Sequence, residues 1–249
     1  MTTEYSGSGD PQRSLQLLWG TRQRSRRGPR PKLTVEAIAR AAIDVADAEG
    51  VTALSMRHVA ERLGVAPMSL YTYVPGKAEL IDVMLDTVAG ELSPMDALPG
   101  DWRARVRAWA AEALASYQRH PWVLQVATAH PPMGPNEVGW TDAALRALAD
   151  TGLPDREIVA LIGAVNGFVR GVARGMVDAA QVADRTGVTD EQWYDSRAPL
   201  LEELISPERF PTITRFHHGG VFDEPADVFE FGLERLLDGL GTLIAARGG

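Results

Sequence analysis

The sequence contains no cysteine among its 249 residues, which excludes disulfides, thiolate metal sites and cysteine nucleophiles. It also has no apolar run of about 18 residues, the length that a membrane span needs. The N-terminus lacks the apolar core of a signal peptide. These absences predict a soluble, cytoplasmic protein. Runs that alternate apolar and polar residues are missing as well, and the apolar spacing throughout is helical, so we expect an all-α fold.

Positive charge is scarce overall, because the formal net charge is −8. Residues 20–90 nevertheless hold ten Lys or Arg against eight Asp or Glu, which gives +2, and residues 1–19 carry −1. The remaining −9 therefore lies after residue 90. Six basic residues lie between positions 22 and 32, either as a solvated charged segment or as an arm that neutralises phosphates. This asymmetry favours an N-terminal part that faces nucleic acid.

Three short helices are predicted after the basic segment. Thr34 is a good N-cap for the first, which Gly50 ends, and Ser55 is a good N-cap for the second, which Gly64 ends. Pro67 suits the first turn of a very short third helix. A second and third helix joined by a glycine turn are typical of helix-turn-helix DNA-binding proteins.

The third helix carries the side chains that a DNA-reading helix needs. Leu70 is its apolar anchor, while tyrosine and threonine hydroxyls donate to phosphates and methyl groups contact thymine. Tyr71 and Tyr73 either make such contacts or close the small three-helix core. Lys77, at the start of the next helix, is placed to bind a phosphate. The predicted DNA-binding residues are Arg26, Arg27, Arg30, Lys32, Thr34, Ser55, Met56, Arg57, Ala66, Pro67, Met68, Ser69, Tyr71, Thr72, Tyr73 and Lys77.

Residues 33–80 resemble the DNA-binding domain of the TetR (tetracycline-repressor-like) family of transcriptional regulators. The segments "LTVEAIARAAIDVADAEG" and "LSMRHVAERLGVAPMSLYTYVPGKAEL" carry the resemblance. The later segments "HPW", "NGFVRGVARG" and "FEFGLERLLDGL" are similar, less specifically, to the tetracycline-repressor-type C-terminal half. The resemblance implies a homodimeric repressor that binds a palindromic operator and releases it when a small ligand enters the C-terminal domain. Residues 1–31 are rich in Ser, Gly and charge, which predicts a flexible basic arm whose apolar island "LQLLW" at 15–19 is either unstructured or a small helix. The resemblance implies the DNA-binding domain at 32–79 and a ligand-binding and dimerisation domain at 80–249.

Two helices of the C-terminal half have more apolar surface than one contact face requires. The last helix is apolar on more than one side, and the helix over 156–180 has glycine at every fourth position. We interpret both as the dimer seam, with a tight contact inside one subunit as the alternative. The predicted interface residues are Gly163, Gly167, Gly171, Phe231, Leu236, Leu240 and Leu243.

Five of the six tryptophans lie after residue 100. They either line an apolar ligand cavity with a few orienting polar groups or belong to an ordinary core. The candidate pocket residues are Trp102, Trp109, Tyr117, Trp122, Gln125, Trp140, Asn166, Phe168, Arg170, Met176 and Trp193. Residues 206–225 are predicted as a loop in which the adjacent His217 and His218 point apart, so we expect no metal site and no cofactor. Tetracycline repressors hold a magnesium–drug complex through histidines that have no clear match here, so tetracycline is not the expected ligand.

The competing hypothesis is an all-α small-molecule carrier or enzyme with a vestigial DNA-binding head. The sequence has no Ser/His/Asp order, pocket carboxylate pair, phosphate loop or metal-ligand spacing that would support an enzyme. We therefore predict a transcriptional regulator that is not an enzyme, and specifically a repressor released by a small apolar molecule. An activator with the same architecture is the third possibility.

Overall fold

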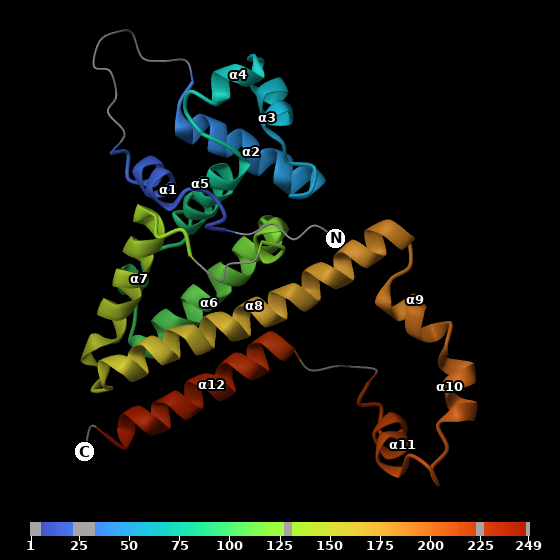
Figure 1. Ribbon diagram of the computed structural model, residues 1–249. Coiled ribbons are helices and arrows are strands. Elements are labelled where there is room, and N and C mark those ends of the chain that lie inside the picture. Colours follow the sequence, from blue (N-terminus) through green and yellow to red (C-terminus); the bar gives the residue numbers. More distant parts are fainter. Residues whose placement is uncertain (1–5, 22–32, 127–130, 223–226, 248–249) are drawn as a thin grey trace.

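The computed structural model describes residues 6–21, 33–126, 131–222 and 227–247, and within these ranges it contains helices and no strand (Figure 1). The all-α prediction is confirmed. The helices are α1 (Pro11–Leu18), α2 (Val35–Glu49), α3 (Met56–Leu63), α4 (Pro67–Leu70), α5 (Lys77–Ala89), η1 (Met95–Ala97), α6 (Trp102–Arg119), η2 (Pro121–Leu124), α7 (Pro135–Leu148), η3 (Ala149–Thr151), α8 (Asp155–Thr186), α9 (Asp190–Asp195), α10 (Ala198–Leu204), α11 (Pro211–His218) and α12 (Val228–Ala245).

Helices α2, α3 and α4 form a small head whose boundaries follow the predicted caps. The Thr34 hydroxyl accepts from the Ala37 N–H at 3.1 Å, and the Ser55 hydroxyl accepts from the His58 N–H at 3.1 Å. Gly64 ends α3 at φ 66°, a left-handed conformation that glycine adopts without strain. The next residues can therefore turn sharply into α4.

The larger body is built from α6, α7, α8 and α12, which share one apolar core. The head has its own core, to which α5 and η2 also contribute. Helix α5 contacts α2 on the head side and α7 on the body side. It is therefore the principal connection between the two parts.

Helix α1 is an ordered element that the sequence analysis placed inside a flexible arm. It packs against α5, with Ser14 and Leu17 buried (Figure 1). Asp10 caps it by accepting from the Gln12 and Arg13 N–H groups. The apolar island at 15–19 therefore does contribute to a helix, and the flexible-arm prediction does not hold for residues 11–18, because their apolar side has a partner on α5 that lies far away in the sequence.

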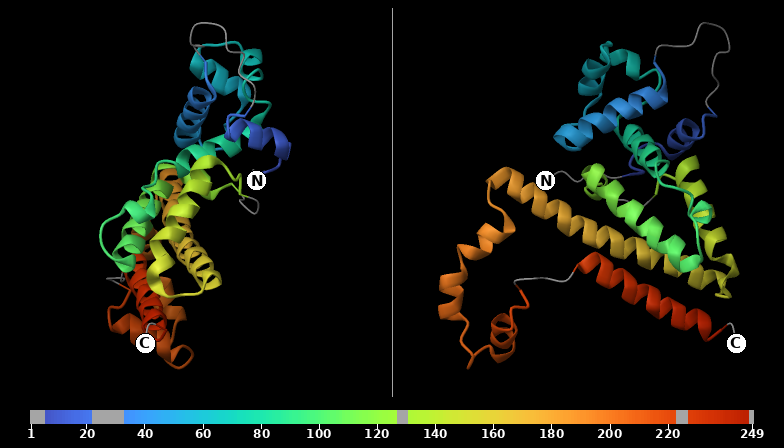
Figure 2. Two further views of the ribbon diagram at one scale, coloured as in Figure 1. Left: turned by 90° about the vertical axis from the view of Figure 1, so that its left-hand side faces the viewer. Right: turned by 180° about the vertical axis from the view of Figure 1, so that it is seen from behind.

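Helices α9, α10 and α11 extend away from the body and return to α12 (Figures 1 and 2). Helix α11, from Pro211 to His218, lies within the stretch predicted as a loop. That prediction is wrong because Pro211 at the first helical position stabilises a short helix that the local pattern did not reveal. We call residues 187–222 the extended arm below.

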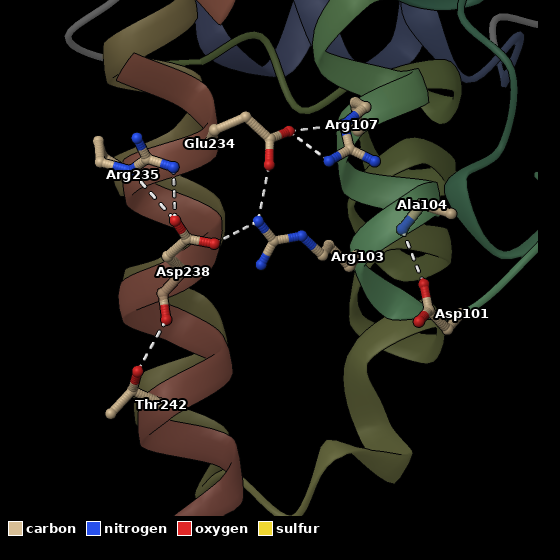
Figure 3. Close-up of polar contacts among 8 residues, drawn as sticks. All are labelled: Asp101, Arg103, Ala104, Arg107, Glu234, Arg235, Asp238 and Thr242. Carbon is tan, nitrogen blue, oxygen red and sulfur yellow. Dashed lines mark hydrogen bonds and ion pairs between the residues drawn. The ribbon is translucent and has the colours of Figure 1, made fainter. Parts of the chain in front are cut away.

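A charged network fixes α12 against α6 on their outer side (Figure 3). The Arg103 guanidinium donates to Glu234 Oε2 at 2.7 Å and to Asp238 Oδ1 at 2.5 Å. Arg107 Nε donates to Glu234 Oε1 at 2.7 Å, so Glu234 is shared by two cations from α6. These hydrogen bonds hold the pKa of Glu234 below its ordinary value of 4.5.

Glu234→Gln is expected to lower the thermal unfolding midpoint by a few degrees at pH 7, because it removes the charge that α12 offers to two arginines. A carboxylate whose pKa is depressed by folding stabilises the fold above its unfolded pKa, and this contribution disappears as the pH falls through the folded pKa. The difference in Tm between the variant and the unsubstituted protein should therefore narrow as the pH falls below the ordinary pKa range of a glutamate. Calorimetric scans from pH 7 to pH 3 measure it.

The matched control is Glu61→Gln, which removes an exposed ion pair between Arg57 and Glu61 inside α3. A pair within one exposed helix contributes little to stability, so Tm should hardly change. Equal losses in both variants, or a difference in Tm that does not narrow toward acid pH, would contradict the role assigned to Glu234.

Candidate DNA-binding surface and ligand cavity

The short helix α4 presents a row of exposed side chains on the outside of the head. Leu70 is fully buried and anchors it, while Met68 is 74% exposed and Tyr71 is 43% exposed. Ser69 and Thr72 are exposed as well. Because hydroxyls, an aromatic edge and a thioether reach outward from a rigidly anchored turn, this surface has the chemistry for contacts to phosphates and base edges.

The other predicted DNA contacts differ in how far they are exposed. Thr34, Ser55, Arg57, Ala66 and Pro67 are partly or fully exposed around the same surface. Met56 is only 7% exposed and packs in the head core, so its side chain is not available to DNA. Tyr73 is half-buried against the same core, which supports the packing alternative. The remaining predicted contacts lie outside the described residues, and they are Arg26, Arg27, Arg30 and Lys32.

Helix α5 begins in the head, shortly after α4, and runs toward the body. Lys77, its first residue, is partly exposed just beyond α4. Further along the same helix, Leu85, Val88 and Ala89 line a cavity. One rigid helix therefore connects the proposed DNA-binding surface with the interior of the body.

A cavity of about 300 Å³ lies between α5, α6, α7 and α8. Its volume is at the lower end of the range for small-molecule sites. The residues that line it are Leu85, Val88, Ala89, Leu92, Trp109, Ala113, Ser116, Tyr117, Val123, Pro131, Pro132, Glu137, Trp140, Asn166 and Arg170.

The structure brings five of the predicted pocket residues together, namely Trp109, Tyr117, Trp140, Asn166 and Arg170. The other six predicted pocket residues lie elsewhere. Trp122 is fully buried and donates its indole N–H to Asp47 at 2.8 Å, while Phe168 stacks on Phe229. The remaining four are absent from the cavity wall, and they are Trp102, Gln125, Met176 and Trp193.

Sequence reasoning missed the contributions of α5 and of the Pro131–Pro132 turn. The α5 residues lie before the tryptophan-rich half, so no local signal linked them to a pocket. The two adjacent prolines are typical of a loop, but which elements face this loop across the cavity depends on tertiary contacts.

The polar lining of the cavity has a cationic side and an acidic side. Arg170 lies over the Tyr117 ring at 5.8 Å and donates to the carbonyl oxygens of Val123 and Val126. On the other side, burial raises the pKa of Glu137, and the negative charges of Asp86 and Asp82 add to this effect. Glu137 therefore takes up a proton more readily than an exposed glutamate.

Two indole N–H groups in the cavity wall lack an acceptor. Trp109 and Trp140 lie with ring centroids 5.1 Å apart, and neither buried Nε1 atom has a hydrogen-bond partner in the described chain. A buried donor without an acceptor costs about 1–3 kcal/mol. A ligand with hydrogen-bond acceptors could relieve this penalty after a small movement of either ring.

His120 joins the head to the body at a second point. Its Nδ1 lies 2.9 Å from an oxygen of Asp47 on α2, and its Nε2 lies 3.1 Å from Glu91 Oε2. Trp122 binds the same Asp47 carboxylate. The "HPW" segment therefore fixes the C-terminal end of α2 to the start of the body.

Most of the predicted dimer residues lie on an uncovered side of α8 and α12, whereas Leu240 packs against the core of the body. Gly163, Gly167 and Gly171 are exposed, and a Cβ on any of them would meet no described atom within 4 Å. They therefore do not make the close contact inside one subunit that was the alternative. That contact involves Gly232 instead, where a Cβ would overlap the Phe168 ring. Phe231 is 60% exposed and Leu243 is 36% exposed, while Leu236 and Leu240 are half-buried.

Two protein-family models match the chain. The one described as "Bacterial regulatory proteins, tetR family" covers residues 38–84, which span the head and the start of α5. The one described as "Tetracyclin repressor-like, C-terminal domain" covers residues 94–244. Together they cover both predicted domains and leave α1 outside.

Similar proteins include the HTH-type transcriptional repressor DrrR1 of Streptomyces coeruleorubidus, which is 44% identical over 249 residues, or 100% of this chain and 92% of that protein. Among solved structures, apo ActR from Streptomyces coelicolor has a TM-score of 0.71 and 27% identity, with 88% of this chain and 99% of that chain covered. ActR in complex with actinorhodin has a TM-score of 0.70 and 27% identity, with 84% and 95% covered.

Proposed function

Because this chain belongs to the TetR family of transcriptional regulators, we propose that it is a cytoplasmic homodimeric repressor that leaves a palindromic operator when a small molecule enters the cavity. The exposed row on α4, around Tyr71, supports the DNA-binding half of this proposal. The cavity supports the ligand-binding half. ActR, a structural relative, has been solved with actinorhodin and with (S)-DNPA.

The proposed dimer pairs α8 and α12 with the same helices of a second copy. Helix α8 is long and apolar enough to cross a membrane by length and composition alone, and only 28% of its most apolar window is buried. One side of it packs on α6, and Arg174 donates to the Leu124 carbonyl at 2.7 Å, as expected for a core helix. Its glycine-rich side lacks a described partner, and a second copy would bury it.

The extended arm also has more exposed apolar surface than a monomer normally shows. In the proposed dimer it would lie against the second copy. Its large exposed apolar residues are Val188, Trp193, Tyr194, Leu200, Leu201, Leu204, Phe210, Ile213, Phe216, Val221 and Phe222.

The observation that carries the proposal is the course of α5. Lys77 at the start of α5 lies just beyond α4, and Leu85, Val88 and Ala89 further along α5 line the cavity. A ligand that fits one position of α5 better than another would change the distance between the two DNA-binding heads of a dimer. The ligand shifts the equilibrium between these two arrangements of the dimer only by the difference in its binding free energy for them, which is typically about 1–3 kcal/mol.

The test is selection from a random DNA pool at about physiological salt, followed by sequencing of the retained fraction. We expect a palindrome whose half-sites lie about one helical turn or more apart. Affinity for it should fall steeply with salt, because phosphate contacts release counterions. Retention without an enriched motif would overturn the proposal and favour the carrier or enzyme alternative.

A further inference from the structure

Helix α1 reaches the turn that walls one side of the cavity, although it precedes the DNA-binding head in the chain (Figure 1). The Trp19 indole N–H donates to the Met133 carbonyl oxygen at 3.0 Å. The neighbouring residues Pro131 and Pro132 line the cavity. Both family models leave α1 outside their matched ranges, although the similarity to DrrR1 covers the whole chain.

The turn is fixed on its inner side by α5. A Cβ on Gly134 would overlap the Asp86 carboxylate, and the N–H groups of Asn136 and Glu137 donate to Asp86 at 3.1 and 3.0 Å. Met133 has φ 57°, the one positive value of a non-glycine residue in the described chain. Such a conformation persists only where surrounding contacts hold it.

Helix α1 is itself attached to α5 by buried polar contacts. The Ser14 hydroxyl donates to Asp82 Oδ2 at 2.8 Å, and the Gly7 N–H donates to the other oxygen at 3.0 Å. The Asp10 N–H donates to Glu79 Oε1 at 3.3 Å, and Leu17 is buried beside them. Trp19, the C-cap residue of α1, therefore belongs to an element attached to α5, while its indole binds the turn before α7.

We propose that α1 is part of the ligand-sensing apparatus, and that Trp19 is a positioning residue that holds the Pro131–Gly134 turn against the cavity. This inference rests on the proposed function, because it assigns α1 to the cavity that the ligand would enter. A ligand that packs against the turn in the position that Trp19 holds stabilises the Trp19–Met133 hydrogen bond and the docking of α1. By linkage, undocking α1 must weaken ligand binding by the same factor.

The docking of α1 also has a consequence for the DNA side. The segment that follows α1 in the sequence carries six basic residues between positions 22 and 32. Since α1 is the element that precedes this segment, its position on α5 sets where the segment begins. Ligand binding in the cavity would then affect DNA binding through α1 as well as through α5.

The test compares the full-length protein with Trp19→Phe, which keeps an aromatic ring and removes the indole N–H, and with Ser14→Asp, which places a carboxylate against Asp82. The control is Gln12→Ala, an exposed change on the same helix. Hydrogen exchange is followed in peptides over residues 131–141. Binding of the apolar fluorophore 8-anilinonaphthalene-1-sulfonate and of the selected operator is titrated in parallel.

We expect exchange in the turn to rise roughly threefold to tenfold in Trp19→Phe, which corresponds to the loss of one hydrogen bond. Ser14→Asp should raise it further. Fluorophore affinity should fall by a similar factor in both variants. Tm should hardly change in Trp19→Phe, whereas it should fall in Ser14→Asp because two carboxylates then meet at a buried contact. Gln12→Ala should behave like the unsubstituted protein. Unchanged exchange in the turn of both variants would overturn the proposal.

The exchange measurement separates this proposal from the proposed function. If the unsubstituted protein binds no fluorophore and selects no operator while the turn still responds to Trp19→Phe, the ligand-responsive repressor fails and the α1–turn contact stands. If operator and fluorophore bind but neither variant changes exchange or affinity, the repressor stands and the role of α1 is wrong.

Discussion

Gly167→Phe is expected to convert the protein into a monomer that no longer holds its operator tightly. Gly167 lies in the exposed glycine row of α8, and no described atom lies within 4 Å of a Cβ built there. The side chain can therefore be accommodated inside one subunit. In a dimer that pairs two α8 helices closely, it would keep the backbones apart.

The loss of dimerisation should reduce operator affinity by about 10²–10⁴-fold, because the second head then no longer binds as part of one molecule. Sedimentation equilibrium measures the mass, and fluorescence anisotropy with the selected operator measures the affinity. Gly139→Phe is the matched control, since Gly139 is an exposed glycine on α7 that also has nothing within 4 Å. A dimeric Gly167→Phe protein with normal affinity would place the dimer interface elsewhere.

Tyr71→Ala is expected to abolish operator recognition while leaving the fold intact. The side chain is 43% exposed on the outside of the head, so its removal leaves no core cavity. A good contact to a base or phosphate is worth about 1–3 kcal/mol, and a dimer makes it twice. Operator affinity should therefore fall by roughly 10²–10⁴-fold, with Tm changed by no more than a degree or two.

Anisotropy titrations at fixed salt and a thermal melt measure these two effects. Thr141→Ala is the control, because Thr141 is exposed on α7, outside both the head and the proposed dimer faces. It should leave operator binding unchanged. A Tyr71→Ala protein that binds normally would show that the head reads DNA through other residues, and the exposed Ser69 and Thr72 would be examined next.

Patterns within single helices predicted much of the fold. Thr34 and Ser55 were recognisable as N-caps and Gly64 as a helix end, because capping depends on residues within one turn. The burial of Val59, Ala60 and Leu70 also follows from helical spacing. For the same reason the exposure of Tyr71 could be anticipated.

Predictions about which distant elements meet were less complete. Trp109 and Trp140 were placed correctly at the cavity, but Trp122 and Phe168 were assigned there although they pack elsewhere. A tryptophan is a candidate for any apolar surface, and its own neighbours in sequence do not say which surface it joins. Met56 shows the same limit, since its burial depends on how α3 is rotated in the head.

The sequence by itself determined the helical class, the caps of the head helices, the exposed side chains of α4 and membership of a regulator family. These properties depend on residues a few positions apart. The tertiary structure alone decided that α5 walls the cavity, that Gly232 rather than the α8 glycines allows a close contact within the subunit, and that α1 touches the Met133 turn. Each of these contacts joins residues far apart in the chain, and only packing in three dimensions selects between the partners that their chemistry permits.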